Sequence, residues 1–213
     1  MGTFNKGING EFHGKVGSVI GSKWKSIPYI KGLPRVKKHR KSSEDQLKQQ
    51  EKFKLLLQFF APLKRYLAIG FQQFMDRQTA VNAAMRFNFD EALSETEHGI
   101  QLEYSKIQLS QGSLFTPGNE KGTWVDEGLE ISWNTKTYGI RGDFDDQVYV
   151  VCFCEESDIP FISKKATRGD GKLLLSKIPK KGMIMEHAWL FLSDALGKQV
   201  SRTIYIPIPT KED

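Results

Sequence analysis

The chain has 213 residues and a formal net charge of +6; 39 % of its residues are hydrophobic and 26 % are charged. This balance excludes a wholly disordered or fibrous chain and is typical of one large domain or two small ones. No apolar stretch approaches the roughly 18 residues of a membrane-spanning helix, and the glycine-rich start lacks the pattern of a Sec signal peptide. We therefore expect synthesis in the cytoplasm and no membrane span.

The positive charge is concentrated near the N-terminus. Residues 1–65 contain fifteen Lys or Arg and four Asp or Glu, which gives +11, whereas residues 66–213 contain sixteen and twenty-one, which gives −5. A basic arm on an acidic body favours either an anionic partner, such as nucleic acid, or head-to-tail association with other copies of the chain.

Residues 1–42 are predicted to form an extended, basic, glycine-rich arm and linker. Glycines recur every three or four residues between Gly7 and Gly21, but glycine costs about 1 kcal/mol relative to alanine inside a helix, so turns or bulges are the preferred interpretation. The arm has too little apolar surface to fold alone, and its large apolar side chains need a cover from the body or from another subunit. The candidate assembly residues are Phe4, Phe12, Val16, Ile20, Trp24, Tyr29 and Ile30.

Residues 43–99 are predicted to form a helical hairpin. Ser43 and Gln46 have the spacing of a capping box that opens a helix, and the apolar positions that follow cover more than half of the helical circumference. Pro62 lies inside this pattern, so we expect a kink or a break there and a second helix that ends near Met75.

A third, shorter helix is predicted after this break. Thr79 is a plausible N-cap for it, and its apolar positions continue through Ala92, which places its end near Gly99.

Residues 100–213 are predicted to form an antiparallel β-sandwich of immunoglobulin-like type, because apolar residues alternate and turn signals recur. Residues 100–104 alternate, and the phase then slips, which indicates a bulge near Ser105 before a continuation through residues 107–109. Residues 148–153 are apolar on both faces, which indicates a central strand. The other expected strands cover residues 129–133, 173–175, 188–192 and 200–206, with a short one around Phe161 or Tyr138. The fold class is therefore α+β.

The sequence contains no pattern that indicates catalysis, a cofactor or a metal site. The four histidines lie in four different segments, and His187 is expected to be a half-buried structural residue. Asp143, Asp145 and Asp146 have oxygens that calcium would accept, but an acidic turn explains them equally well. Cys152 and Cys154 project to the same face of an expected strand, where a mutual disulfide has poor geometry. We therefore expect a protein without enzymatic activity.

Two alternatives remain open beside self-assembly. Basic residues interleave with Trp24 and Tyr29 in a composition compatible with nucleic-acid binding. The possible anion contacts are Lys15, Lys23, Lys25, Lys31, Arg35, Lys37, Lys38, Arg40 and Lys41. A ligand- or carbohydrate-binding sandwich is the other alternative, and it requires Trp124, Trp133 or Trp189 to be exposed.

The N-terminal motif G-x-x-G-x-F-x-G-K-V-G-x-V-x-G-x-x-W-K, which runs from Gly7 to Lys25, resembles a family of uncharacterised proteins of about this length from Bacteroidota. The resemblance extends over the chain, through residues 46–53, 82–85, 104–107, 112–114 and 200–205. It implies a single-module protein and transfers no activity or site. The order of a glycine-rich arm, a basic linker, a Gln-rich helix and a β-domain is also similar in style to phage or prophage structural modules.

These observations favour a non-enzymatic structural or assembly protein. An arm that cannot bury its own apolar residues can pair with a neighbouring copy, and such a head-to-tail contact propagates into a ring or filament. The expected product is a homopolymer, a filament or a phage-like particle, with other copies of the chain as partners.

Overall fold

The computed structural model describes residues 3–4, 10–24, 27–33, 41–76, 78–97, 99–137, 142–154, 161–176 and 185–209. Two compact units divide the chain, Met1–Glu44 and Asp45–Asp213. The helical segment and the β-rich segment therefore belong to one unit, while the glycine-rich arm forms the other.

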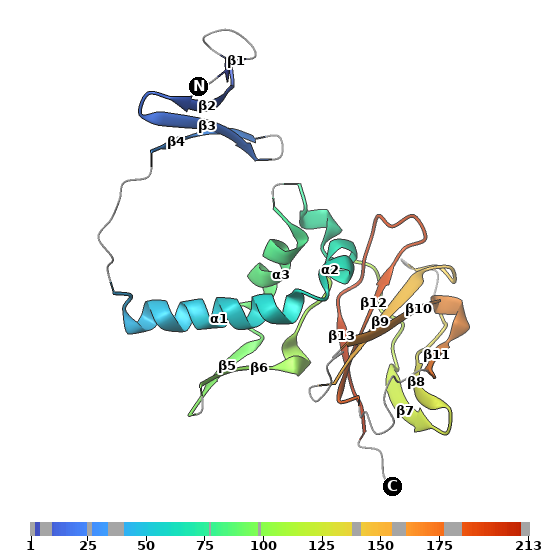
Figure 1. Ribbon diagram of the computed structural model, residues 1–213. Helices are drawn as coiled ribbons and strands as arrows, with labels where there is room; N and C mark the ends of the chain where they lie inside the picture. The colour runs from blue at the N-terminus through green and yellow to red at the C-terminus, as the bar shows by residue number, and fades with distance from the viewer. Residues whose placement is uncertain are drawn as a thin grey trace. The chain divides into compact units, whose positions relative to one another are not determined.

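The N-terminal unit is a four-stranded antiparallel sheet with the strand order β1-β2-β3-β4 (Figure 1). Its strands are β1 (Thr3–Phe4), β2 (Phe12–Val16), β3 (Val19–Trp24) and β4 (Ile27–Gly32). A tight turn joins β2 to β3, since Val16 pairs with Val19 and Gly17 between them has a φ of 56°, a conformation that glycine adopts without steric cost. The arm is thus extended with a turn at a glycine, as predicted, but its strands also pair with one another.

The helices begin and break where the sequence predicts. Helix α1 (Glu44–Phe60) starts directly after Ser43, and the turn that contains Pro62 separates it from α2 (Lys64–Gly70). A 3₁₀ turn, η1 (Gln72–Phe74), follows. Thr79 caps α3 (Ala80–Asn88), because its hydroxyl accepts a hydrogen bond of 3.2 Å from the Asn82 amide.

The predicted continuation of α3 to Gly99 is wrong. The helix ends at Asn88, and the hairpin of β5 (Leu93–Thr96) and β6 (Gly99–Leu102) follows it. Gly99 has a φ of 116°, which a helix does not contain and which glycine tolerates at the start of a strand.

The predicted bulge at Ser105 is wrong as well, because a 3₁₀ turn, η2 (Tyr104–Lys106), occupies this position. Residues 107–109 form no strand. Their backbone amides bind side chains instead of a neighbouring strand: the Gln108 amide donates to Asn88 Oδ1 at 2.7 Å and the Leu109 amide donates to Thr203 Oγ1 at 2.8 Å.

Two antiparallel sheets face each other in the larger unit, with strand orders β10-β9-β12-β13 and β11-β8-β7. Their strands are β7 (Lys121–Val125), β8 (Gly128–Ser132), β9 (Gln147–Phe153), β10 (Phe161–Thr167), β11 (Lys172–Leu175), β12 (His187–Ser193) and β13 (Ile204–Pro207), with a 3₁₀ turn η3 (Arg168–Asp170) after β10. The prediction of a central strand over residues 148–153 is confirmed by β9. Strand β7 was not predicted.

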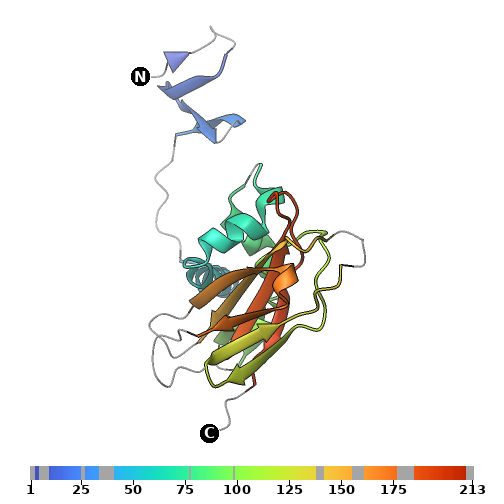
Figure 2. The same ribbon diagram turned by 90° about the vertical axis from the view of Figure 1, so that its right-hand side faces the viewer.

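The larger unit has three layers: in Figure 1 the helices, the four-stranded sheet and the three-stranded sheet lie side by side, and in Figure 2 the three-stranded sheet lies in front. One hydrophobic core lies between the two sheets and includes Val148, Val150 and Leu190. A second core lies between the helices and the other face of the four-stranded sheet and includes Phe60 and Trp189. Helices thus cover one outer face of the sandwich, and the fold class is α+β, as predicted.

Candidate functional site

The N-terminal sheet carries the candidate assembly residues, and strand alternation separates them onto two faces. Trp24 pairs with Ile27, and Ile20 pairs with Lys31. Because paired residues of antiparallel strands project to the same side, Ile20, Trp24 and Tyr29 share one face. The opposite face carries Phe12, Val16 and Ile30, and Phe4 is the register partner of Phe12.

We call the first of these the aromatic face. It is defined by Lys15, Ile20, Trp24, Ile27, Tyr29 and Lys31. Trp24 is 50 % exposed, and Ile27 and Tyr29 are each 42 % exposed. Ile27 was not among the candidate assembly residues, although its spacing from Tyr29 in an extended strand places both on one side.

The second face, which we call the glycine face, is defined by Phe12, Gly14, Val16, Val19, Gly21, Ile30 and Gly32. Within residues 10–24, 27–33 and 41–44 of the N-terminal unit, Gly21 is the only buried residue. Ile30 is 64 % exposed. Both faces of this sheet therefore expose apolar side chains to solvent, and the two hydrophobic cores of the structure contain no described residue of this unit.

The basic candidates fall into two groups. Lys15, Lys23 and Lys31 lie on the sheet, where the Lys23 ammonium approaches the Glu11 carboxylate at 3.4 Å, and Lys41 is exposed ahead of α1. The remaining candidates lie outside the described residues, and these are Lys25, Arg35, Lys37, Lys38 and Arg40.

The difference in net charge between the two structural units is smaller than the difference between residues 1–65 and residues 66–213. Residues 1–44 contain ten Lys or Arg and two Asp or Glu, and residues 45–213 contain twenty-one and twenty-three, so the units carry +8 and −2. Part of the basic segment belongs to α1, where Lys52 and Lys48 bind Glu95 at 2.8 and 3.5 Å and lower the pKa of its carboxyl. The acidic side of a head-to-tail contact therefore has to be a local feature of the larger unit.

In the acidic loop considered for calcium, the Asp146 carboxylate is bound by other groups of the protein. Asp146 is buried, and its Oδ2 accepts hydrogen bonds from Arg168 Nε and Nη2 at 3.1 and 3.0 Å and from the Asp143 amide at 3.0 Å. Within the described ranges no group of three or more His, Cys, Asp or Glu residues is arranged to hold a metal ion.

The remaining candidates for chemistry, His187, Cys152 and Cys154, lie within the packed part of the larger unit. His187 is half-buried, as predicted, and its Nδ1 lies 2.7 Å from the Tyr205 hydroxyl while its ring stacks on Tyr104. Cys152 and Cys154 are free and buried, and burial raises the pKa of the Cys152 thiol to about 12. A thiol with this pKa is a poor nucleophile at neutral pH.

The expectation of exposed tryptophans on the sandwich is wrong for Trp133 and Trp189. Both are buried, with exposed fractions of 6 % and 0 %. The Trp133 indole donates to the Arg168 carbonyl oxygen, and the Trp189 indole donates to that of Tyr104. Trp124 is half-buried and donates to the Pro209 carbonyl oxygen. A carbohydrate platform built from these three rings is therefore not supported.

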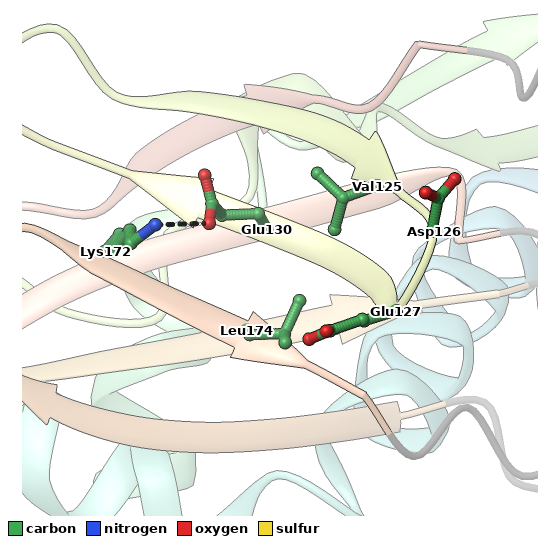
Figure 3. Close-up of a pocket in the computed structure, with 6 residues that line it drawn as sticks. All are labelled: Val125, Asp126, Glu127, Glu130, Lys172 and Leu174. Carbon is green, nitrogen blue, oxygen red and sulfur yellow. Dashed lines mark hydrogen bonds and ion pairs between the residues drawn. The ribbon is translucent and has the colours of Figure 1, made fainter.

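A hollow of about 540 Å³ lies on the outer face of the three-stranded sheet (Figure 3). Its lining is formed by Val125, Asp126, Glu127, Glu130, Lys172 and Leu174. Lys172 on β11 binds Glu130 on β8 at 3.0 Å across the strands. No sequence motif marks these residues, although Glu130 lies between the buried Leu129 and Ile131 and therefore has to face outward.

Comparisons with known proteins agree with the assignment to a family without a known activity. No described helix is long and apolar enough to cross a membrane. A comparison of the sequence with curated proteins found no match, and neither did a comparison with solved structures. Residues 11–207, which include most of the N-terminal sheet and nearly all of the larger unit, match a family of unknown function, and the chain thus belongs to DUF6266.

Proposed function

We propose that this chain is a non-enzymatic assembly protein that associates with other copies of itself through its N-terminal sheet. The products would be a homopolymer, a filament or a phage-like particle. One observation carries the proposal: the N-terminal sheet exposes apolar and aromatic side chains on both faces and has no described side chain in a core.

The N-terminal sheet needs to pack at least one of its apolar faces against a protein surface to be stable. Units of about 40 residues are usually stabilised by disulfides, metals or association, and an isolated small sheet is marginal in water unless one face is packed. Burial of each large side chain on the aromatic face would contribute on the order of 1.5 to 3 kcal/mol. Contact with a protein surface therefore stabilises both the sheet and the assembly.

The faces of the sheet are better suited to this contact than its β4 edge. All of β4 is exposed, but Pro28 has no amide hydrogen to donate and Lys31 adds a charge. Both features oppose the addition of a further strand at an edge. Trp24 and Tyr29 are the large, amphipathic side chains that dominate the binding energy of protein interfaces.

The experiment measures the molar mass of the full-length protein by light scattering over a range of concentrations at low ionic strength. The wild-type protein should increase in mass with concentration, and W24A/Y29A should remain a monomer. The matched control is F144A/L196A, because Phe144 and Leu196 are 61 % and 76 % exposed on the larger unit. A wild-type protein that stays monomeric throughout the range would contradict the proposal.

Nucleic-acid binding is the second candidate, and the aromatic face favours it specifically. Lys15 and Lys31 lie on the same side as Trp24 and Tyr29, which combines phosphate contacts with rings on which bases stack. A nucleic acid would leave the glycine face uncovered, so this candidate explains less of the exposed apolar surface. Titration with single-stranded DNA and RNA at several salt concentrations tests it, since binding through phosphates weakens steeply with salt.

We also propose that the sandwich is immunoglobulin-like. Taken as strands A to G with a C′ strand, the orders β7-β8-β11 and β10-β9-β12-β13 correspond to A-B-E and C′-C-F-G, and immunoglobulin-type sandwiches have closely related strand orders. An experimental structure of the larger unit, superposed on immunoglobulin and fibronectin type III domains, tests this assignment.

A further inference from the structure

We infer that the acceptor of the N-terminal sheet is the hollow on the outer face of the three-stranded sheet of a second copy. We call this surface the acidic hollow and define it by Val125, Asp126, Glu127, Glu130, Lys172 and Leu174. The inference rests on the proposed self-association, and it names the surface that the aromatic face contacts.

The acidic hollow lies on the uncovered side of the sandwich. The helices pack on the four-stranded sheet, and Figure 2 shows the three-stranded sheet in front of it on the opposite side. Val125 is 38 % exposed and Leu174 is half-buried. In Figure 3 these two apolar side chains flank the hollow from β7 and β11, the strands on either side of β8.

The charges of the hollow complement those of the aromatic face. Lys172 neutralises Glu130 at 3.0 Å, whereas Asp126 and Glu127 are exposed in the β7–β8 turn and form no ion pair within the described part of the chain. The aromatic face offers Lys15 and Lys31 on either side of Ile20, with Tyr29 next along β4 and Trp24 at the far end of β3. Two lysines on a face with aromatic rings therefore match two carboxylates beside an apolar hollow.

Size also fits this match. A volume of about 540 Å³ lies within the range of roughly 300 to 1,000 Å³ of pockets that bind drug-sized molecules. It is therefore ample for a tryptophan side chain together with parts of its neighbours.

The same charges disfavour a symmetric contact in which the Lys15–Ile20–Lys31 rows of two aromatic faces lie over each other. Such a contact would bring the lysines of both copies together, and facing like charges are unfavourable across an interface. A contact between the aromatic face and the acidic hollow uses different surfaces of the two copies. Such a contact is heterologous. It builds a ring if the rotation between copies closes, and otherwise a filament with one surface free at each end.

The test uses the full-length chain and reverses charge on each surface. D126K/E127K changes the hollow and K15E/K31E changes the aromatic face, and all four residues are exposed. Each variant alone should self-associate about tenfold or more weakly than the wild type. The matched control is D90K/E91K, which makes the same charge change at an adjacent, exposed Asp-Glu pair after α3 and should behave as the wild type.

Mixing the two variants gives the decisive result. An equimolar mixture of D126K/E127K and K15E/K31E should recover assembly, because both kinds of contact again join opposite charges. If D126K/E127K alone assembles as the wild type does, the acceptor is wrong while the proposed self-association stands. If both variants dissociate and their mixture does not recover, direct contact between these surfaces is wrong. A wild-type protein that is monomeric at every concentration overturns both proposals. This holds also if the monomer results from contact between the aromatic face and the acidic hollow of the same copy.

Discussion

Phe12 lies directly over Gly21 in the N-terminal sheet. A Cβ placed on Gly21 would come within 2.6 Å of Phe12 Cδ2 and would collide with the Phe12 carbonyl oxygen. Gly21 is therefore a glycine because the β2 backbone and a phenyl ring occupy the space that any side chain would need. This pair belongs to the N-terminal motif, so the motif glycine at position 21 serves the packing of a sheet, whereas the one at position 17 serves a turn.

Gly21→Ala should disrupt the N-terminal sheet and with it the self-association. The added methyl collides with backbone atoms of β2, which cannot move without loss of the β2–β3 pairing. Gly32→Ala is the matched control, since a Cβ at Gly32 meets nothing within 4 Å. The measurement is the concentration dependence of the molar mass, together with the rate of proteolysis within residues 1–44. Equal behaviour of the two variants would contradict this account of Gly21.

Loss of either partner of the Arg168–Asp146 pair should strongly destabilise the larger unit. Both side chains are 2 % exposed, and Arg168 also donates to the Phe115 carbonyl oxygen at 2.7 Å. A buried charge without its partner costs about 3 to 5 kcal/mol. Urea unfolding of R168M, D146L and R168M/D146L checks this, and the double variant should be more stable than either single one.

The surface pair Lys52–Glu95 provides the contrast to this buried pair. Lys52→Ala should change the unfolding midpoint little, because Glu95 is 51 % exposed and keeps Lys48 as a partner, so solvent screens the lost attraction. If R168M and Lys52→Ala lowered the unfolding midpoint equally, the buried pair would contribute no more to stability than the Lys52–Glu95 pair.

Local signals predicted most elements of the larger unit. Pro62 ended a helix, Thr79 capped another, and the two-sided apolar run of β9 indicated its central position. Each of these signals depends on residues close in sequence. The error at residues 107–109 arises because distant side chains replace backbone pairing there, as Thr203 does for the amide of Leu109 and as Asn88 does for that of Gln108.

The candidate site was predicted in composition but not in arrangement. The apolar residues of the arm were identified, and their division between two faces follows only when the register of β3 and β4 is known. Trp133 and Trp189 could not be assigned to the interior from their type alone, because tryptophan occurs both in cores and on binding surfaces. The acidic hollow requires β7, a strand whose apolar alternation is weak in the sequence.

Asn88→Ala should destabilise the larger unit by about 1 to 3 kcal/mol, because the partly buried Gln108 amide would lose its acceptor. The Asn88 side chain also donates to the carbonyl oxygens of Ala84 and Gln108, at 2.8 and 2.9 Å. Asn82→Ala is the control on the same helix, since Asn82 is exposed. Chemical denaturation of the two variants gives the comparison, and an equal loss of stability would show that the Asn88 bonds contribute nothing beyond helix propensity.

Burial of Cys152 should make the protein less stable in alkali. Its folded-state pKa is raised from the ordinary value of 9.0 to about 12, so the unfolded thiol ionises first. The contribution is fully present below pH 9 and is lost as the pH rises through 12. Unfolding of the wild type and of Cys152→Ala should be measured by urea titration between pH 7 and the most alkaline condition at which both still fold. The free energy of unfolding should fall more steeply with pH in the wild type, and parallel curves would show that the Cys152 thiol ionises equally in both states.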